Sequence, residues 1–497
     1  MPDRLSLLDA SFLYLEEPTT AMHVGSMAVF EPPAEGFDYD RLVTLVAARI
    51  AYVPRYRQRV RVVPGRLANP VWVDDEDFDV TYHVRRSALP RPGSQEQLLE
   101  LVARVQSRPL DRSRPLWEVY LVEGLEDGRF AIVTKSHQAL VDGVNAVDIG
   151  QVILDDSPET PEVPTDTWKP SKEPSDLELL AGALADVVRS PGDVVDSVRG
   201  GLVDVRATAG RVLGQLGHLA STAARTAARP APTSPLNAEI GEQRRYAVAA
   251  TSLEDHRAVR ARHSRRGSEL SVNDVVLATV AGALRTWLLT RGEPVVPATV
   301  VRALVPVSVH DPDDDPLTSD DSDEPARGAL HGGGHRTGNQ VAAFVVDLPV
   351  GEPNPAVRLH QIAYSMRAHA EAGRAVGAQA LVGIAGFAPP TLHSLGARVA
   401  SAVSRRLFNL VVTNVPGPQH PLYAGGARML ASYPVMPLAK GQAVSIGLTS
   451  YDGGVYYGVN GDRDAMPDVD VLAGCLVDSL TELRETARSR APRRATT

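Results

Sequence analysis

The chain has 497 residues, 43% of them hydrophobic, which suits two or three domains with large cores. Its formal net charge of -9 provides no basic footprint, so we expect no nucleic-acid partner. The single cysteine, Cys475, excludes an intrachain disulfide. No apolar run reaches about 18 residues, and the N-terminal residues lack a secretory signal pattern. These features predict a cytoplasmic protein without a membrane-spanning helix.

A predicted β-hairpin leads into the most informative polar motif of the chain. Residues 117–125 alternate and are rich in β-forming side chains, residues 126–128 predict a turn, and residues 130–137 predict the second strand. Successive side chains of a strand point to opposite faces, so His137 and Gln138 are expected to face different spaces. A catalytic group at such a strand end would be held on a rigid element while facing a cleft.

After this hairpin the chain is expected to turn at Asp142 and Gly143 into an apolar-periodic helix that ends near Leu154. Residues 155–172 are rich in Pro, Thr, Asp and Ser, as in a linker. Between residues 198 and 223, apolar side chains recur at alternating spacings of four and three, which predicts one amphipathic helix. We expect this helix to dock across the two halves, with adhesion to a membrane or a lipid droplet as the alternative.

The second half alternates predicted strands with helices, and one helix carries clear signals at both ends. Ser271, followed three residues later by Asp274, predicts the N-terminus of this helix, and Arg291 with Gly292 predicts its end. Asn273 therefore lies in the first turn, where it either faces a ligand or serves only as part of the cap.

These elements predict three parts of the chain. Residues 1–160 form an N-terminal domain with the polar motif, residues 161–235 a linker with the amphipathic helix, and residues 236–490 a C-terminal domain. Residues 311–335 are acidic and rich in glycine, so they predict a disordered surface loop. A metal site is the alternative for its aspartates, but their spacing does not match a calcium-binding loop, and we predict no metal site.

Residues 135–143, Lys-Ser-His-Gln-Ala-Leu-Val-Asp-Gly, nearly reproduce the HHxxxDG signature of the wax ester synthase/diacylglycerol acyltransferase family. The chain resembles that family along its length, because six further motifs follow in the family's order. Any one of them would be weak evidence, whereas the series makes a strong resemblance. The six motifs are residues 8–13 with 22–25, 114–118, 272–275, 302–308, 338–340 and 413–418.

The resemblance implies an α/β fold of two domains, that of the CoA-dependent acyltransferases such as chloramphenicol acetyltransferase, with mixed sheets flanked by helices. It places the motif at the domain interface, in a tunnel that acyl-CoA enters from one side and the acceptor from the other. The implied reaction moves a long-chain acyl group from acyl-CoA to diacylglycerol, forming triacylglycerol, or to a long-chain alcohol, forming a wax ester. Acyl-CoA is a substrate, and no cofactor is implied.

The motif set resembles the actinobacterial branch of the family, and a composition rich in Arg, Ala and Val suits a high-GC genome. We therefore expect diacylglycerol to be the main acceptor. Peripheral association with the inner face of the membrane or with lipid droplets is the corresponding expectation for a protein that acts on such a substrate.

The chain departs from the signature at the second histidine, where it has Gln138. In the family this histidine is the general base that takes the proton of the acceptor hydroxyl, and an amide has no basic lone pair near neutral pH. Loss of a positioned base typically costs about 10²–10⁴ in rate. Two functions therefore stay open: an acyltransferase of reduced activity, and a catalytically impaired relative that binds acyl-CoA or lipid.

His137 and Gln138 each keep two interpretations. His137 either supports the motif loop, as the first histidine does in the family, or replaces the missing base at an irregular strand end. Gln138 is either an inert amide or a donor that polarises the thioester carbonyl. In the family the aspartate orients the loop through a salt bridge, and the glycine permits close backbone approach. These roles carry over to Asp142, with Arg302 as its expected partner, and to Gly143.

The remaining candidates belong to motifs that lie near the substrate in the family. The Pro-Leu-Trp motif is expected to pack beside the active site. Asn414 lies in a Thr-Asn-Val-Pro-Gly sequence that predicts a structural turn. The candidate substrate-binding residues are Pro115, Leu116, Trp117, Asn273, Asp274 and Asn414.

Overall fold

The computed structural model describes the greater part of the chain. The described stretches are residues 2–141, 149–159, 166–189, 230–264, 269–308, 341–371, 376–377 and 407–489. Some features expected from the sequence lie outside them, namely Asp142, Gly143, the amphipathic helix at 198–223, the acidic loop at 311–335 and the motif at 338–340.

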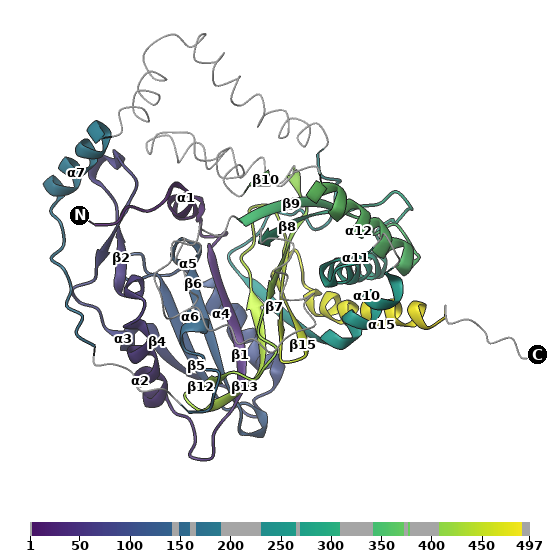
Figure 1. The fold of residues 1–497 in the computed structure, drawn as a ribbon, viewed down its shortest axis with the longest axis horizontal. Helices are drawn as coiled ribbons and strands as arrows, with labels where there is room; N and C mark the ends of the chain where they lie inside the picture. The colour runs from purple at the N-terminus through teal and green to yellow at the C-terminus, as the bar shows by residue number, and fades with distance from the viewer. Residues whose placement is uncertain are drawn as a thin grey trace, which may run out of the picture.

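One mixed sheet forms the frame of the N-terminal half (Figure 1). Its order is β12-β13-β1-β6-β5-β4, in which β4 and β5 pair in parallel and the other neighbours are antiparallel. Its strands are β1 (His23–Glu31), β4 (Val84–Ala88), β5 (Trp117–Glu123), β6 (Phe130–His137), β12 (Tyr423–Ala424) and β13 (Ala427–Val435). A separate ribbon pairs β2 (Gln58–Arg61) with β3 (Val71–Asp74).

A second mixed sheet forms the frame of the C-terminal half, in the order β10-β9-β8-β11-β14-β15-β7. Strand β11 runs parallel to both of its neighbours, and the other pairs are antiparallel. Its strands are β7 (Arg244–Ser252), β8 (Val301–Ser308), β9 (Val341–Leu348), β10 (Val376–Gly377), β11 (Leu410–Pro416), β14 (Val444–Tyr451) and β15 (Gly454–Asp462).

Helices flank both sheets, so the expected arrangement of two mixed sheets flanked by helices is confirmed (Figure 1). Helix α4 packs between the first sheet and β7. The helices of the first half are α1 (Leu7–Leu15), α2 (Tyr39–Ile50), α3 (Val80–His83), α4 (Gln95–Ser107), α5 (Gln138–Val141), α6 (Ile149–Val152) and α7 (Asp176–Arg189). Those of the second half are α10 (Leu253–His263), α11 (Val272–Thr290), α12 (Pro355–Glu371) and α15 (Val469–Ser489).

The hairpin predicted at residues 117–137 is confirmed. Strands β5 and β6 pair antiparallel from Trp117 opposite Ser136 to Val122 opposite Ala131. A short 3-10 turn at Glu126–Gly128 joins them. Every residue of β6 is buried, because α4 covers one face of the sheet and the main core of the N-terminal half covers the other.

The predicted capped helix is α11, and both of its ends are confirmed. The Asp274 amide donates to Ser271 Oγ at 3.0 Å, and the Ser271 amide donates to Asp274 Oδ2 at 2.8 Å, which completes a capping box. The helix ends at Arg291, after which Gly292 adopts a φ of 73° that suits glycine.

Helix α11 is buried on nearly all sides, because it forms the centre of the second core. Within the described chain it is the one helix that is long and apolar enough to cross a membrane by length and composition. However, 78% of its most apolar window is buried inside the protein, as in a core helix.

The two halves exchange structure through β13. This strand follows most of the second sheet in the chain, yet it pairs with β1 of the first sheet, with Val435 opposite Gly25. The expected C-terminal domain, residues 236–490, therefore supplies two strands of the N-terminal sheet. A division of the chain at residue 235 does not describe this exchange, and strand-pairing partners so far apart leave no local signal in the sequence.

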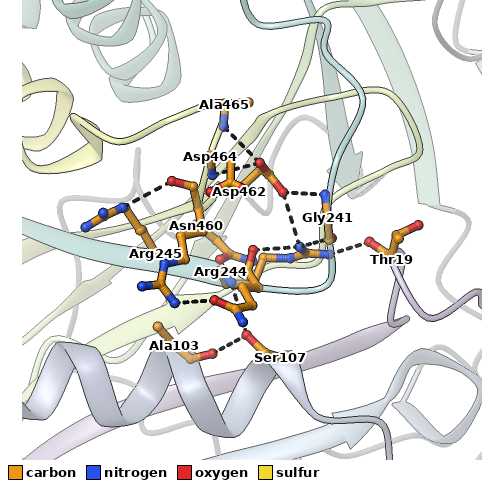
Figure 2. Close-up of polar contacts among 12 residues, drawn as sticks. Thr19, Ala103, Ser107, Gly241, Arg244, Arg245, Asn460, Asp462, Asp464 and Ala465 are labelled. Carbon is orange, nitrogen blue, oxygen red and sulfur yellow. Dashed lines mark hydrogen bonds and ion pairs between the residues drawn. The ribbon is translucent and has the colours of Figure 1, made fainter.

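A buried arginine joins the halves at a second point (Figure 2). Arg244, at the start of β7, donates through Nη1 to Gly241 O at 2.7 Å and through Nη2 to Thr19 O. Its backbone amide donates to Ser107 Oγ at the end of α4, at 3.1 Å. Asp462 lies 3.7 Å from Arg244 Nη1 and accepts a hydrogen bond from the Gly241 amide at 2.7 Å. The second sheet is thus held against α4 and the chain segment before β1.

Close approach of β15 to β13 requires glycine at position 458. A Cβ atom there would lie 1.9 Å from Pro434 O, which is backbone, and 2.5 Å from Tyr246 Oη. The Tyr246 hydroxyl already donates to Pro434 O at 2.9 Å, so neither neighbour can withdraw without breaking this hydrogen bond.

We predict that Gly458→Ala destabilises the protein by about 1–3 kcal/mol, because the added methyl group must push β15 and β13 apart. The measurement is the midpoint of chemical unfolding. Gly474→Ala, at an exposed position of α15, is the matched control, since a Cβ at that position meets nothing within 4 Å. It should leave stability unchanged or raise it by up to about 1 kcal/mol. Equal midpoints for the two variants would contradict the packing described.

Candidate active site

The motif strand β6 ends at His137, and α5 begins at Gln138 beside α1 (Figure 1). Backbone hydrogen bonds hold this end on both sides. The His137 amide donates to Leu116 O at 2.9 Å, and the Gln138 amide donates to Met22 O at 2.9 Å. The end of the strand is therefore fixed by the segments that precede β5 and β1, and the next side chain leaves the sheet from a defined point.

The His137 ring is fully buried and turned inward. The Ala139 amide donates to His137 Nδ1 at 3.0 Å. A backbone amide only donates, so Nδ1 must present its lone pair, and the proton of the neutral ring lies on Nε2. His137 Nε2 lies 3.7 Å from Glu16 Oε2. Neither ring nitrogen has a lone pair directed at a substrate, which disfavours His137 as the replacement base.

Gln138 differs from its neighbour in both burial and contacts. Its side chain is half-buried and forms no hydrogen bond within the described chain. The expectation that His137 and Gln138 face different spaces agrees with this placement. Gln138 starts a helix, however, so strand alternation is not the whole reason for the difference.

Glu16 lies at the centre of a buried polar cluster behind His137. One carboxylate oxygen lies 3.1 Å from His23 Nε2, and the other accepts a hydrogen bond from Arg112 Nε at 2.9 Å. Arg112 also donates through Nη2 to Leu13 O at 2.8 Å. Burial alone would raise the pKa of Glu16, but His137 and His23 outweigh it and hold this pKa well below its usual range.

His23 is the second imidazole of this cluster. It lies directly opposite His137 on the neighbouring strand, and the two ring centroids are 6.1 Å apart. Burial lowers the pKa of His23 to about 4, although the Glu16 carboxylate acts to raise it. His23 is therefore neutral at physiological pH, and the net charge of Glu16 is balanced by Arg112.

Lys135 continues the same buried row two residues before His137. Its ammonium donates to Val105 O at 3.0 Å and to Arg108 O, at the C-terminal end of α4, and lies 3.8 Å from Glu118 Oε2. Burial lowers the pKa of Lys135 to about 8. A cation at a helix C-terminus is favourable, so Lys135 attaches α4 to the motif strand.

The Pro-Leu-Trp motif adjoins the strand end and is buried. Leu116 supplies the carbonyl that accepts the His137 amide, and Trp117 Nε1 donates to Tyr56 O at 2.8 Å. The ring of His83 stacks on Trp117 with centroids 4.5 Å apart. Pro115, Leu116 and Trp117 thus have the contacts of packing residues.

Asn273 and Asn414 come together from distant parts of the chain. Asn414 Nδ2 donates to Asn273 Oδ1 at 3.2 Å, and both side chains are half-buried. The expected turn at Asn414 is wrong, because this residue lies within β11 opposite Leu448. Pro416 is the last residue of β11, and Gly417 follows it. Asp274 is engaged in the capping box of α11, and burial raises its pKa.

Arg302, the expected salt-bridge partner of Asp142, pairs with another carboxylate in the structure. Arg302 Nε donates to Asp347 Oδ1 at 2.6 Å. Asp142 and Gly143 themselves lie outside the described stretches, so their roles and the expected salt bridge stay predictions.

Sequence reasoning missed Glu16 and Arg112 as parts of the site. They are 96 residues apart, and neither has a local pattern that marks it. His23 had a usable signal, because it belongs to one of the motifs that carry the resemblance. The structure thus brings the candidates into two groups: one around His137 with the Pro-Leu-Trp motif, and one at Asn273 and Asn414.

Comparison with known proteins extends the resemblance from short motifs to whole domains. The sequence-family model of the wax ester synthase/diacylglycerol acyltransferase catalytic domain matches residues 5–276. The family model of the WS/DGAT C-terminal domain matches residues 337–484. The first of these spans more than half of the chain and includes the complete motif strand.

Individual relatives indicate the same family. The probable diacylglycerol O-acyltransferase tgs3 of Mycobacterium tuberculosis is 49% identical over 264 residues, which cover 53% of this chain and 97% of that protein. The probable diacylglycerol O-acyltransferase tgs2 of the same species is 34% identical over 486 residues, covering 96% and 98%. The solved wax ester synthase/diacylglycerol acyltransferase from Marinobacter aquaeolei VT8 has 28% identity and a TM-score of 0.68, covering 98% of this chain and 100% of its own. The chain therefore belongs to the wax ester synthase/diacylglycerol acyltransferase family.

Proposed function

We propose that this protein is a diacylglycerol O-acyltransferase that moves a long-chain acyl group from acyl-CoA to diacylglycerol, with long-chain alcohols as secondary acceptors. The observation that carries the proposal is the match to the family's catalytic domain over residues 5–276. It is supported by relatives that share nearly the whole length of the chain and carry that activity in their names.

The reaction needs no redox step and no cofactor. The acceptor hydroxyl oxygen bonds to the thioester carbonyl carbon, the carbon–sulfur bond breaks, and the hydroxyl proton ends on the CoA thiolate. In the family the second histidine carries that proton. Here Gln138 occupies its position, and its side chain is half-buried and forms no hydrogen bond inside the described chain. Its amide N–H can donate to the oxyanion that develops on the carbonyl oxygen, which supplies part of the transition-state stabilisation without a base.

Diacylglycerol is a membrane lipid, so the proposed enzyme must meet its acceptor at a lipid surface. We place it peripherally at a membrane or a lipid droplet, with the amphipathic sequence at 198–223 as the candidate contact. The alternative function is that of a catalytically impaired relative that binds acyl-CoA or lipid, and it is favoured by the single substitution at position 138.

We predict that purified protein supplied with labelled palmitoyl-CoA forms triacylglycerol from diolein as its main product. Parallel reactions with hexadecanol and without acceptor measure wax ester synthesis and thioester hydrolysis. Wax ester exceeding triacylglycerol by about 10-fold, a difference of roughly 1.4 kcal/mol in transition-state binding, would overturn the choice of acceptor.

We predict that Gln138→His raises the rate of acyl transfer by about 10-fold or more, because it restores an imidazole at the position of the family's base. Gln138→Asn is the matched control, since it keeps an amide and should give no gain. His137→Ala cannot make this distinction, because removal of the buried ring would leave the Ala139 amide without its acceptor and open a cavity beside Glu16. Absence of turnover in the wild type and in Gln138→His, with acyl-CoA binding intact, would favour the binding protein.

A further inference from the structure

The carboxylate of Glu16 is placed to act on the motif without touching a substrate. It follows the last residue of α1, and its amide donates to Phe12 O at 3.1 Å as that helix ends. The side chain then turns inward and is 9% exposed. Oε1 lies 3.1 Å from His23 Nε2, and Oε2 binds Arg112 and lies 3.7 Å from His137 Nε2 on the adjacent strand. One carboxylate thus joins α1 to the ends of β1 and β6.

Each neighbour of Glu16 restricts its orientation. Arg112 binds one oxygen through both Nε and Nη2, while its Nη2 also donates to Leu13 O at the end of α1. The carboxylate is therefore held from the outside by a fork of donors, which gives it a defined direction. Oε1 faces His23 Nε2 at 3.1 Å, whereas His137 Nε2 lies 3.7 Å from Oε2, the same oxygen that binds Arg112.

The tautomer of His137 follows from this arrangement. Its Nδ1 accepts the Ala139 amide at 3.0 Å, so its proton must lie on Nε2, on the side where Glu16 provides a negative oxygen. With the opposite tautomer, an N–H on Nδ1 would face the Ala139 N–H, and a lone pair on Nε2 would face a carboxylate. Both contacts would be repulsive, so the carboxylate and the backbone amide favour the same state of the ring.

Three consecutive backbone amides at the end of β6 each donate a hydrogen bond. The amide of His137 is held by Leu116 O, that of Gln138 by Met22 O, and that of Ala139 by the His137 ring. The first two depend on backbone alone. The third depends on the tautomer of a side chain, and it determines how α5 leaves the sheet and where the half-buried side chain at position 138 starts.

We infer that Glu16 is a positioning residue: by holding His137 in the Nε2–H tautomer, it fixes the first turn of α5 and with it the side chain of residue 138 at the acyl-transfer site. The inference rests on the proposed function for its effect on rate, while its effect on the imidazole is independent of that function. Glu16 needs no contact with acyl-CoA or acceptor for this role.

Glu16→Gln tests the inference with little change of shape. In Glu16→Gln the carbonyl oxygen takes the place of Oε2, which binds Arg112 and lies nearest to His137, so the NH2 group faces His23. His137 Nε2 then faces a neutral oxygen in place of a negative one, which weakens the preference for the N–H on that atom. We expect kcat for triacylglycerol synthesis to fall by about 10-fold while the KM for acyl-CoA changes by less than about 2-fold, as for a misplaced group that does not bind substrate. Glu16→Asp keeps the charge and should recover part of the rate.

Glu123→Gln is the matched control. This carboxylate belongs to the same sheet and pairs with exposed Arg86, away from the motif. It should leave both kinetic constants unchanged, since exposed pairs contribute little. Rates for Glu16→Gln within about 2-fold of the wild type would overturn the inference.

The tautomer itself is measured on full-length protein labelled with ¹⁵N-histidine, with the His137 signals assigned by their loss in His137→Gln. The wild type should show a protonated Nε2 and an unprotonated Nδ1, and Glu16→Gln should shift both signals toward a mixture of tautomers. A wild-type ring with its proton on Nδ1 would overturn the inference, even if Glu16→Gln failed to fold. If the wild type forms no triacylglycerol, the proposed function fails, and the NMR result still decides the role of Glu16.

Discussion

The motif end of this protein depends on a buried negative charge and on how that charge is paired. An unpaired carboxylate in a protein interior is too costly to persist as an ion, so Glu16 requires the guanidinium of Arg112 and the two imidazoles that surround it. The same requirement connects four segments: the end of α1, the segment before β5, and the strands that carry His23 and His137. Pairing of the buried Glu16 carboxylate thus holds the end of β6 against these segments.

The same turn connects this cluster to the second half of the chain. Directly after Glu16, the carboxylate of Glu17 contacts Lys440 Nζ at 2.6 Å, and Thr19 O accepts a hydrogen bond from Arg244. The pairing of β13 with β1 adds a second connection a few residues further on. The segment between α1 and β1 thus contacts both halves of the chain.

Local signals in the sequence predicted local structure well. The hairpin at 117–137 and the capping box of α11 follow from alternation and from side chains three residues apart, and both were found. The exchange of β13 and the cluster around Glu16 were not predicted, because they join residues far apart in the chain and leave no periodic pattern. At Asn414 the nearby Pro and Gly suggested a turn, but pairing with β14 extends β11 through that residue and on to Pro416.

The functional conclusion depends on which side chain of the motif meets the substrate. His137 Nδ1 accepts the Ala139 amide and Nε2 faces Glu16 at 3.7 Å, whereas Gln138 is half-buried at the start of α5. The most direct measurement is a crystal structure of the protein with a non-hydrolysable acyl-CoA analogue that carries a ketone in place of the thioester. We predict that the ketone carbon lies beside the side chain of Gln138 and out of contact with the ring of His137. An analogue whose carbonyl meets a nitrogen of His137, or that binds away from position 138, would contradict it.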